Sequence, residues 1–370
     1  MKKILFSAHK YVGLVTGILM FFTSISGALY VFHDELFQLI HRNTLYTQVY
    51  NEPTKSLDQL LEKAQKHIGG DLPINSITTY SDLSRTWEFK SYHTNPNAIH
   101  YFDWIKQNKV VYINPHTGDI SGTINLKYEF FQLIKMFHWS YLLKTEYGQP
   151  IVGIVTLLFL ICLLTGVWIW WPKNGIKRKH FRFRTKKGFK IINRDVHLTL
   201  GILTFPFAFI ICITGLIWAY RWMMVLIYLI FNLGVNNYSA STTKSKDAFP
   251  TKNIYQKIYN QCHQKYPDAY SISLSKRSQK KEATINAFVK LTKPVYYKSV
   301  RIKFDQYTGQ QLEVDSFDES SNGEKAIKMN YDIHTGAIGG IIGKIIMFII
   351  SMILSALPIS GYIIWLNRHK

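Results

Sequence analysis

Four long apolar runs separate stretches of mixed polarity along this 370-residue chain, at residues 11–32, 150–171, 198–220 and 341–366. Each run reaches the roughly 20 residues that an α-helix needs to cross the hydrocarbon core of a bilayer. The first run follows Lys2 and Lys3, as in a signal peptide, but it is longer than the usual apolar stretch of about 7 to 15 residues. The pattern therefore predicts four transmembrane helices, and the first of them is retained.

The same membrane unit occurs twice. A histidine, a glycine four residues later and a hydroxyl–glycine pair further along recur with identical spacing, as His9, Gly13, Ser26 and Gly27 and as His197, Gly201, Thr214 and Gly215. In each unit a second histidine precedes another apolar helix with such a pair: His138 before Thr165-Gly166, and His334 before Ser360-Gly361. Because each unit contributes two helices, the two units are expected to share one orientation. The sequence thus predicts an α-helical bundle of two tandem two-helix repeats.

Two long segments of mixed polarity connect the helices within each unit. Each begins with an amphipathic stretch and continues into alternating strands, and a Thr-Gly pair after an apolar run fits a hairpin whose glycine has a positive φ. We expect each segment to form a small α+β domain. The predicted order is helix 1 in 1–33, an outer domain in 34–136, an interfacial segment with helix 2 in 137–172, a basic loop in 173–196, helix 3 in 197–231, a second outer domain in 232–333, and helix 4 with a tail in 334–370.

Charge is distributed unevenly along the chain, whose formal net charge is +21. Residues 173–194 contain ten lysines and arginines and no acidic residue, whereas nearly all acidic residues lie in the two long segments. The positive-inside rule then places both termini and the basic loop in the cytoplasm, and both long segments outside. Contact with anionic lipid explains the basic loop better than nucleic acid does, because no base-stacking aromatic pattern accompanies it. The three cysteines form no Cys-x-x-Cys motif, which disfavours a zinc site or a disulfide framework.

Several short motifs resemble those of a known family. They are the segments His-Lys-Tyr-Val-Gly at 9–13, Ser-Gly-Ala-Leu-Tyr-Val-Phe-His-Asp-Glu-Leu at 26–36, Thr-Gly-Val-Trp-Ile-Trp-Trp-Pro at 165–172, His-Thr-Gly at 334–336 and Asn-Pro-x-Thr-Gly at 114–118. Together they resemble the PepSY-associated transmembrane family, whose members include iron-regulated membrane proteins and haem-containing ferric-siderophore reductases. The resemblance implies that the two outer domains are PepSY modules, and that the protein lies in a bacterial cytoplasmic (inner) membrane.

The four repeated histidines are the strongest functional candidates, because a histidine at the end of an apolar helix is costly unless it has a ligand or a hydrogen bond. A b-type haem in a helical bundle needs imidazole ligands, small residues where the porphyrin contacts a helix, and apolar walls. Gly13 and Gly201 lie one turn after His9 and His197 and share their helix face. With the resemblance, this predicts two b-type haems, one between His9 and His197 and one between His138 and His334. The alternative is that these residues serve only helix packing.

A fifth histidine complicates the outer site. His33 lies 24 residues after His9, about 36 Å along an ideal helix, and therefore at the outer membrane face. Arg221 has the equivalent position in the second unit. An arginine there suits a haem propionate, and His33 could do likewise or replace an outer iron ligand. The alternative is that both are interfacial side chains that reach toward the headgroups.

Two sites at opposite depths suggest a di-haem electron-transfer protein. The resemblance implies that it reduces ferric chelates such as ferric siderophores on the periplasmic side and so releases iron. No Gly-rich dinucleotide fingerprint follows a predicted strand, so a quinol or a separate reductase is expected as the electron donor. The alternative from another class is a membrane-anchored PepSY protein that binds and regulates secreted peptidases. A transporter is the third interpretation, disfavoured because no carboxylate relay lies within the spans.

Overall fold

A computed structural model describes residues 2–49, 53–69, 72–172, 175–235, 243–246 and 248–367. Lys173 at the start of the basic loop and residues 368–370 of the tail lie outside these ranges. The chain forms two compact units. The helical unit comprises Met1–His33, Leu133–Ile227 and Asn330–Lys370, and the sheet unit comprises Asp34–Gln132 and Tyr228–Met329.

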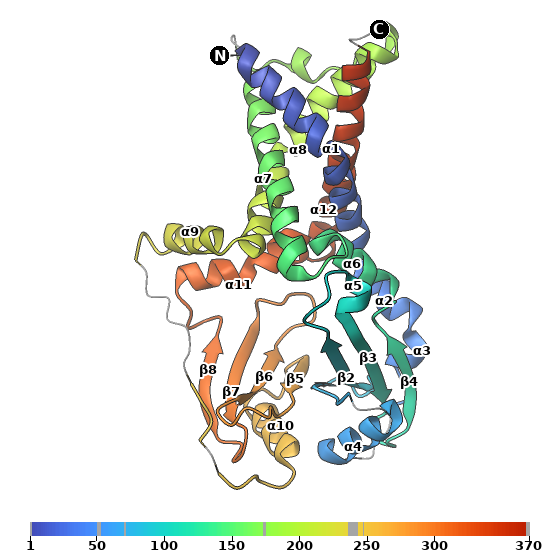
Figure 1. The fold of residues 1–370 in the computed structure, drawn as a ribbon, viewed down its shortest axis with the longest axis vertical. Coiled ribbons are helices and arrows are strands. Elements are labelled where there is room, and N and C mark those ends of the chain that lie inside the picture. The colour runs from blue at the N-terminus through green and yellow to red at the C-terminus, as the bar shows by residue number, and fades with distance from the viewer. Residues whose placement is uncertain are drawn as a thin grey trace. The chain divides into compact units, whose positions relative to one another are not determined.

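Four long helices build the helical unit: α1 (Lys2–Tyr30), α7 (Thr145–Trp170), α8 (Phe189–Ala219) and α12 (Gly340–Leu366). Each packs against two others, in the cyclic order α1, α7, α8 and α12. All four are long and apolar enough to cross a membrane, which confirms the four predicted spans. Figure 1 shows the two chain ends at the same end of this bundle. Two helices begin well before their apolar runs, because polar first turns extend α1 back to Lys2 and α8 back to Phe189.

Shorter helices lie between the spans along the chain, some of them wholly or partly in the sheet unit. They are α2 (His33–Ile40), α3 (Arg42–Leu45), α6 (Phe130–Ser140), α9 (Arg221–Phe231), α11 (Asn322–Thr335) and the 3₁₀ turns Arg178–Phe181, Thr185–Lys187 and Ala337–Gly339. Both α6 and α11 carry an outer histidine and then reverse tightly into the next span. A Cβ on Gly148 or Gly343 would lie 2.1 Å from the carbonyl oxygen of Ser140 or Gly336. Only glycine permits this approach, and the two reversals thereby set where α6 and α11 end.

The sheet unit contains one antiparallel sheet of eight strands, in the order β4-β3-β2-β1-β5-β6-β7-β8. The strands are β1 (Ser76–Tyr80), β2 (Trp87–Thr94), β3 (Ile105–Ile113), β4 (Ile120–Asn125), β5 (Ser271–Ser275), β6 (Thr284–Lys290), β7 (Ser299–Asp305) and β8 (Gln311–Ser316), with the helices α4 (Leu57–Ile68), α5 (Tyr101–Trp104) and α10 (Ile254–Lys265). Alternate residues are buried along β1, β2, β6 and most of β7, as the period of two requires.

We expected each long segment to form its own domain, but the two segments share one sheet. Strand β1 of the first pairs with β5 of the second from Ser76↔Ser275 to Tyr80↔Ser271. One apolar core then includes residues of both segments, among them Leu60, Phe89, Ile258 and Phe304. Each segment contains the expected helix followed by strands, four in each segment, and an exposed edge is removed because β1 and β5 satisfy each other's backbone groups.

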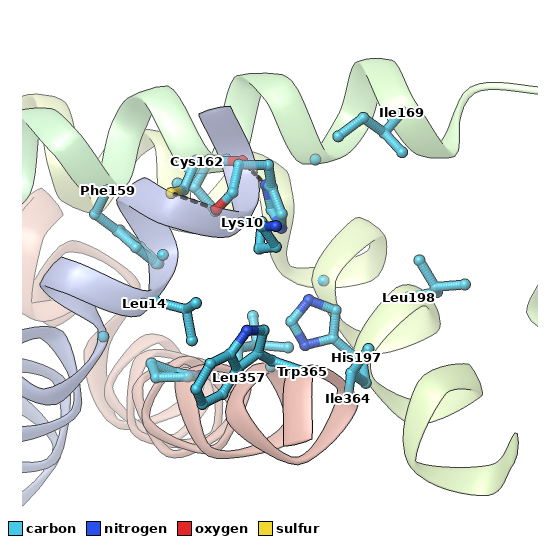
Figure 2. A pocket seen from close by; sticks show the side chains of 18 of the residues that line it. Lys10, Leu14, Phe159, Cys162, Ile169, His197, Leu198, Leu357, Ile364 and Trp365 are labelled. Carbon is cyan, nitrogen blue, oxygen red and sulfur yellow. Dashed lines mark hydrogen bonds between the residues drawn. The ribbon is translucent and has the colours of Figure 1, made fainter. Parts of the chain in front are cut away.

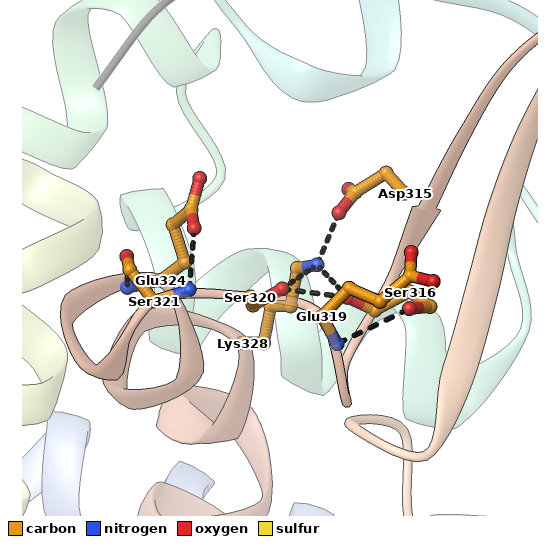
Figure 3. A network of polar contacts seen from close by, with 7 residues as sticks. All are labelled: Asp315, Ser316, Glu319, Ser320, Ser321, Glu324 and Lys328. Atoms are coloured by element: carbon orange, nitrogen blue, oxygen red, sulfur yellow. Dashed lines mark hydrogen bonds and ion pairs between the residues drawn. The ribbon is translucent and has the colours of Figure 1, made fainter. Parts of the chain in front are cut away.

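The start of α11 is fixed by a polar network (Figure 3). The Ser321 N–H donates to the Glu324 carboxylate at 2.8 Å, and the Glu324 N–H donates to the Ser321 hydroxyl at 3.3 Å, which is a reciprocal capping box. Lys328 pairs with Asp315 at the end of β8 and donates to the Ser320 hydroxyl at 2.6 Å. The helix that carries His334 is thereby tied to the strand before it.

Candidate functional site

The inner pair of histidines comes from two spanning helices. His9 on α1 and His197 on α8 have ring centroids 6.3 Å apart, with an angle of 83° between the rings. Both line a cavity of about 350 Å³ within the helical unit, together with Gly13 and Gly201. In Figure 2 the His197 ring projects into the space between the helices, opposite Leu14 and Phe159. The structure therefore brings together the two histidines that the sequence repeat had paired.

The outer pair comes from the two short helices that precede spans. His138 on α6 and His334 on α11 have ring centroids 6.1 Å apart, with an angle of 61° between the rings. Trp218 lies 5.1 Å from the His334 ring, edge to face, and Trp139 contacts Trp218 at 5.7 Å. The His334 ring thus packs against an indole at the end of α8, which in turn contacts the indole next to His138 on α6.

Hydrogen bonds at Nδ1 hold the two histidines of the first repeat. His9 Nδ1 lies 3.0 Å from the Cys162 carbonyl oxygen, and His138 Nδ1 lies 2.8 Å from the Thr23 carbonyl oxygen. A carbonyl oxygen only accepts, so Nδ1 carries the proton in both rings. The lone pair is then on Nε2 in each case.

The same tautomer follows for the second repeat. His197 Nδ1 lies 2.8 Å from the Ser360 hydroxyl, and His334 Nδ1 lies 2.8 Å from the Thr214 hydroxyl. Each hydroxyl already donates to a carbonyl of its own helix, Ser360 to Leu357 and Thr214 to Ile210. The hydroxyl must therefore accept from Nδ1–H, and Nε2 is again left with a lone pair. All four imidazoles share one protonation pattern.

The hydroxyl–glycine pairs are the docking points for these rings, a role that the sequence alone had not revealed. A Cβ at Gly27 would lie 2.9 Å from His138 Cε1, and one at Gly166 would lie 3.1 Å from His9 Cε1. The corresponding distances are 3.6 Å from Gly215 to His334 and 3.5 Å from Gly361 to His197. Each ring thus packs against the glycine of such a pair, and its Nδ1 lies close to the hydroxyl of the same pair. The pair belongs to another helix of the same repeat. The recurrence of the hydroxyl–glycine pairs in both repeats was the signal for this role.

The two pairs lie far apart along the bundle. On α1, 17 residues separate His9 from Ser26, whose hydroxyl lies 3.3 Å from His138 Nδ1. On α8, the same number separates His197 from Thr214, the partner of His334. At 1.5 Å per residue this spacing is about 26 Å, most of the thickness of a bilayer core.

The spacing within each pair suits a metal held between two imidazoles. With metal–nitrogen distances of about 2.0–2.1 Å on both sides, the ring centres would be roughly 6 Å apart. Among the described residues, no group of three or more His, Cys, Asp and Glu side chains is arranged to hold a metal ion by itself. Two imidazoles without further protein ligands match the donor set of a haem held by two histidines.

The family of this chain is shown by a match over residues 6–368 to the family described as PepSY-associated TM region. The chain belongs to this family. With its four apolar helices, it is a multi-pass membrane protein. No curated protein matches the sequence.

The inner cavity of this PepSY-associated protein has open space beside its two glycines. A Cβ at Gly201 would meet no atom within 4 Å, and one at Gly13 would meet only the Cys162 sulfur at 3.8 Å, so both glycines leave room for a flat group. Lys10 and Arg194 also line the cavity and supply positive charge suited to two carboxylates. The walls are otherwise mostly apolar, as the sequence-based hypothesis required.

His33 and Arg221 have equivalent places, each as the first residue of the short helix that follows a span. The His33 ring stacks on Tyr30 at 3.9 Å, and its Nδ1 lies 3.0 Å from the Tyr30 carbonyl oxygen. Arg221 is exposed. The structure therefore pairs His138 with His334, whereas the described contacts of His33 are with Tyr30.

Equivalent turns of the sheet unit differ in one titratable group. Asn114 Oδ1 accepts the backbone N–H of His116 at 2.9 Å, and Asp305 Oδ1 accepts that of Tyr307 at 2.9 Å. Burial alone raises the pKa of the Asp305 carboxyl, but backbone hydrogen bonds, including those from Thr308 and Lys246, outweigh it and hold the pKa below its usual range.

Proposed function

We propose that this protein is a di-haem electron carrier of a bacterial cytoplasmic membrane that reduces ferric chelates, such as ferric siderophores, on the periplasmic side. The observation that carries the proposal is the set of four imidazoles in two facing pairs, about 26 Å apart along the spanning helices. Each ring is fixed through Nδ1 and has its Nε2 lone pair available. The alternative is that these histidines only make hydrogen bonds between helices. This accounts for the contacts of Nδ1, but it assigns no partner to Nε2 among the described residues.

The protein's own residues would hold and tune the cofactor. A haem supplies one-electron redox chemistry once bound between two histidines. The hydroxyl and carbonyl acceptors at Nδ1 fix the orientation of each ring and raise its basicity as a ligand, as second-shell partners do in metal sites. Lys10 and Arg194 would bind carboxylates at the inner cavity, while its apolar walls exclude water. Arg221 and His33 remain candidates for polar contacts at the outer face.

The charge distribution supports an orientation with both termini and the basic loop in the cytoplasm. His9 and His197 then lie near the cytoplasmic surface, and His138 and His334 near the periplasmic surface. A quinol or a separate reductase would supply electrons. Iron would be released because hard oxygen ligands hold Fe(II) less tightly than Fe(III).

The proposal is tested with the purified, detergent-solubilised protein. We expect two haems per chain by pyridine haemochrome assay, low-spin spectra for both, and oxidation of the dithionite-reduced protein when a ferric hydroxamate is added in a stopped-flow instrument. The His138→Ala and His334→Ala variants should lose the outer component and most of this rate. A protein that binds haem but is not oxidised by any ferric chelate would contradict the reductase function, and a haem-free protein would contradict the whole proposal.

A regulatory protein that binds secreted peptidases is the second candidate. The observation that favours it is the sheet unit, which has its own core and ends in two edge strands, β4 and β8, beside which a partner chain could add a strand. This function requires no haem, so the haem assay separates the two candidates. Pull-down of a peptidase by haem-free protein would favour it.

A further inference from the structure

Two buried asparagines have no counterpart in the first repeat. Asn193 lies one helical turn before His197, and Asn330 lies one turn before His334. Their exposed fractions are 8% and 2%. The Asn193 amide donates to the Ser360 carbonyl at 3.0 Å, and the Asn330 amide donates to the Thr214 carbonyl at 3.0 Å. Each asparagine therefore donates a hydrogen bond to the same residue whose hydroxyl accepts one from the neighbouring histidine.

The first repeat has apolar residues at the same offset, Leu5 before His9 and Ile134 before His138. The contacts between ring and hydroxyl differ accordingly. They measure 2.8 Å for both His197 and His334, whereas His9 lies 3.3 Å from the Thr165 hydroxyl and His138 lies 3.3 Å from the Ser26 hydroxyl. The shorter contact occurs in both places where an asparagine is present.

We infer that Asn193 and Asn330 are positioning residues, which make His197 and His334 the fixed member of each facing pair. Two side chains on one helix face bind the same residue of the neighbouring helix. The imidazole bonds to the hydroxyl of that residue, and the asparagine amide donates to its carbonyl oxygen. Together they fix both the rotation and the height of the two helices relative to each other. His9 and His138 have no such asparagine one turn before them, so only the Nδ1 contacts of the rings themselves hold these two side chains.

The role of these residues at a metal rests on the proposed function, and the first test uses the haem-loaded protein. Asn193→Leu and Asn330→Ile introduce the residues of the first repeat. Each should release haem from its own site at least about tenfold faster, the lower end of the effect of second-shell substitutions on metal affinity. The inner spectrum should change only in the first variant, and the outer spectrum only in the second. Thr204→Val is the matched control, because Thr204 is also buried on α8 but bonds only to Leu200 of its own helix.

A second measurement does not depend on haem. Nitrogen-15 NMR of histidine-labelled, haem-free protein reports which ring nitrogen carries the proton. The parent should show Nδ1–H for His197 and His334, assigned by difference from the His197→Ala and His334→Ala variants. Asn193→Leu should add an Nε2–H population for His197 alone. Unchanged haem release together with unchanged NMR signals would overturn the inference. If the parent binds no haem, the proposed function fails, and the NMR result alone decides the role of the asparagines.

Discussion

The inner and outer histidine pairs have nearly the same ring separation but are built from different elements. Both inner rings project from long spanning helices into a cavity lined by glycines. Both outer rings lie on short helices that begin with residues of the sheet unit, and the His334 ring lies next to the indole of Trp218. The duplication thus preserved the geometry of the imidazoles, while their surroundings diverged.

The geometry of the two sites therefore depends on different parts of the chain. The inner site depends on the packing of spanning helices alone. The outer site depends in addition on what holds α11 and α6 in place, such as the contact of Lys328 with Asp315 (Figure 3). A substitution that disturbs these contacts should therefore change the arrangement of the outer histidines more than that of the inner histidines.

Removal of one histidine from each pair should give the largest effect. His197→Ala should abolish the inner haem component and spare the outer one, and His334→Ala should do the reverse, because each imidazole lies beside the other histidine of its own pair and the two pairs are separated along the bundle. Haem stoichiometry and redox titration check this. His263→Ala serves as control, since His263 is exposed and stacks on Tyr259 in the sheet unit. Loss of both components from either single variant would show that the sites are not independent.

Filling the inner cavity should give the next largest effect. Gly201→Leu adds a side chain where a Cβ meets no atom within 4 Å, so the protein should fold while the space for a flat group is lost. We expect the inner component to fall several-fold and the outer component to stay, as measured by absorption of the reduced protein. Gly339→Leu is the control, because this glycine also has open space but lies outside the cavity lining. Normal inner haem content in Gly201→Leu would refute the assignment of the cavity.

The outer site should tolerate substitution unequally at its two docking glycines. Gly27→Ala places a Cβ 2.9 Å from His138, whereas Gly215→Ala places one 3.6 Å from His334, which is ordinary contact. The first should cost about 1–3 kcal/mol, as overpacking does, and shift the outer spectrum. The second should be nearly neutral. Thermal unfolding with spectroscopy of both variants checks this, and equal behaviour would contradict the described packing.

The smallest effect concerns acid and the sheet unit. The folded-state pKa of Asp305 is lowered, so this carboxyl contributes stability above its ordinary pKa and loses the contribution as pH falls through the folded value. Hydrogen exchange of the turn after β7 should therefore accelerate toward low pH, while the equivalent turn at Asn114 changes less. Asp305→Asn should remove the difference. Acid sensitivity that persists in this variant would assign the effect to other groups.

The apolar runs and the repeated histidines predicted much of the helical unit. Length and hydropathy alone indicate a span, because the bilayer sets both requirements. The equal depth of His9 and His197 followed from the order of the repeats, and the structure places these rings together. Family membership, predicted from five short motifs, is confirmed over residues 6–368.

Other features depended on contacts between distant segments. The joining of β1 to β5 was missed, because strand alternation does not specify a partner strand. The docking of His138 on Gly27 and the grip of Asn330 on Thr214 were also missed, since 111 and 116 positions separate these residues along the sequence.

The four spans, the charge asymmetry and the duplication can be predicted from the sequence, because they follow from composition and local periodicity. The folded structure was needed to show which glycine contacts which ring, which nitrogen of each imidazole is protonated, and that two segments share one sheet. Those properties arise when helices and strands far apart in sequence satisfy each other's buried polar groups. Local sequence patterns indicate that such polar groups are present, but only the packing of the helices and strands determines which partners they have.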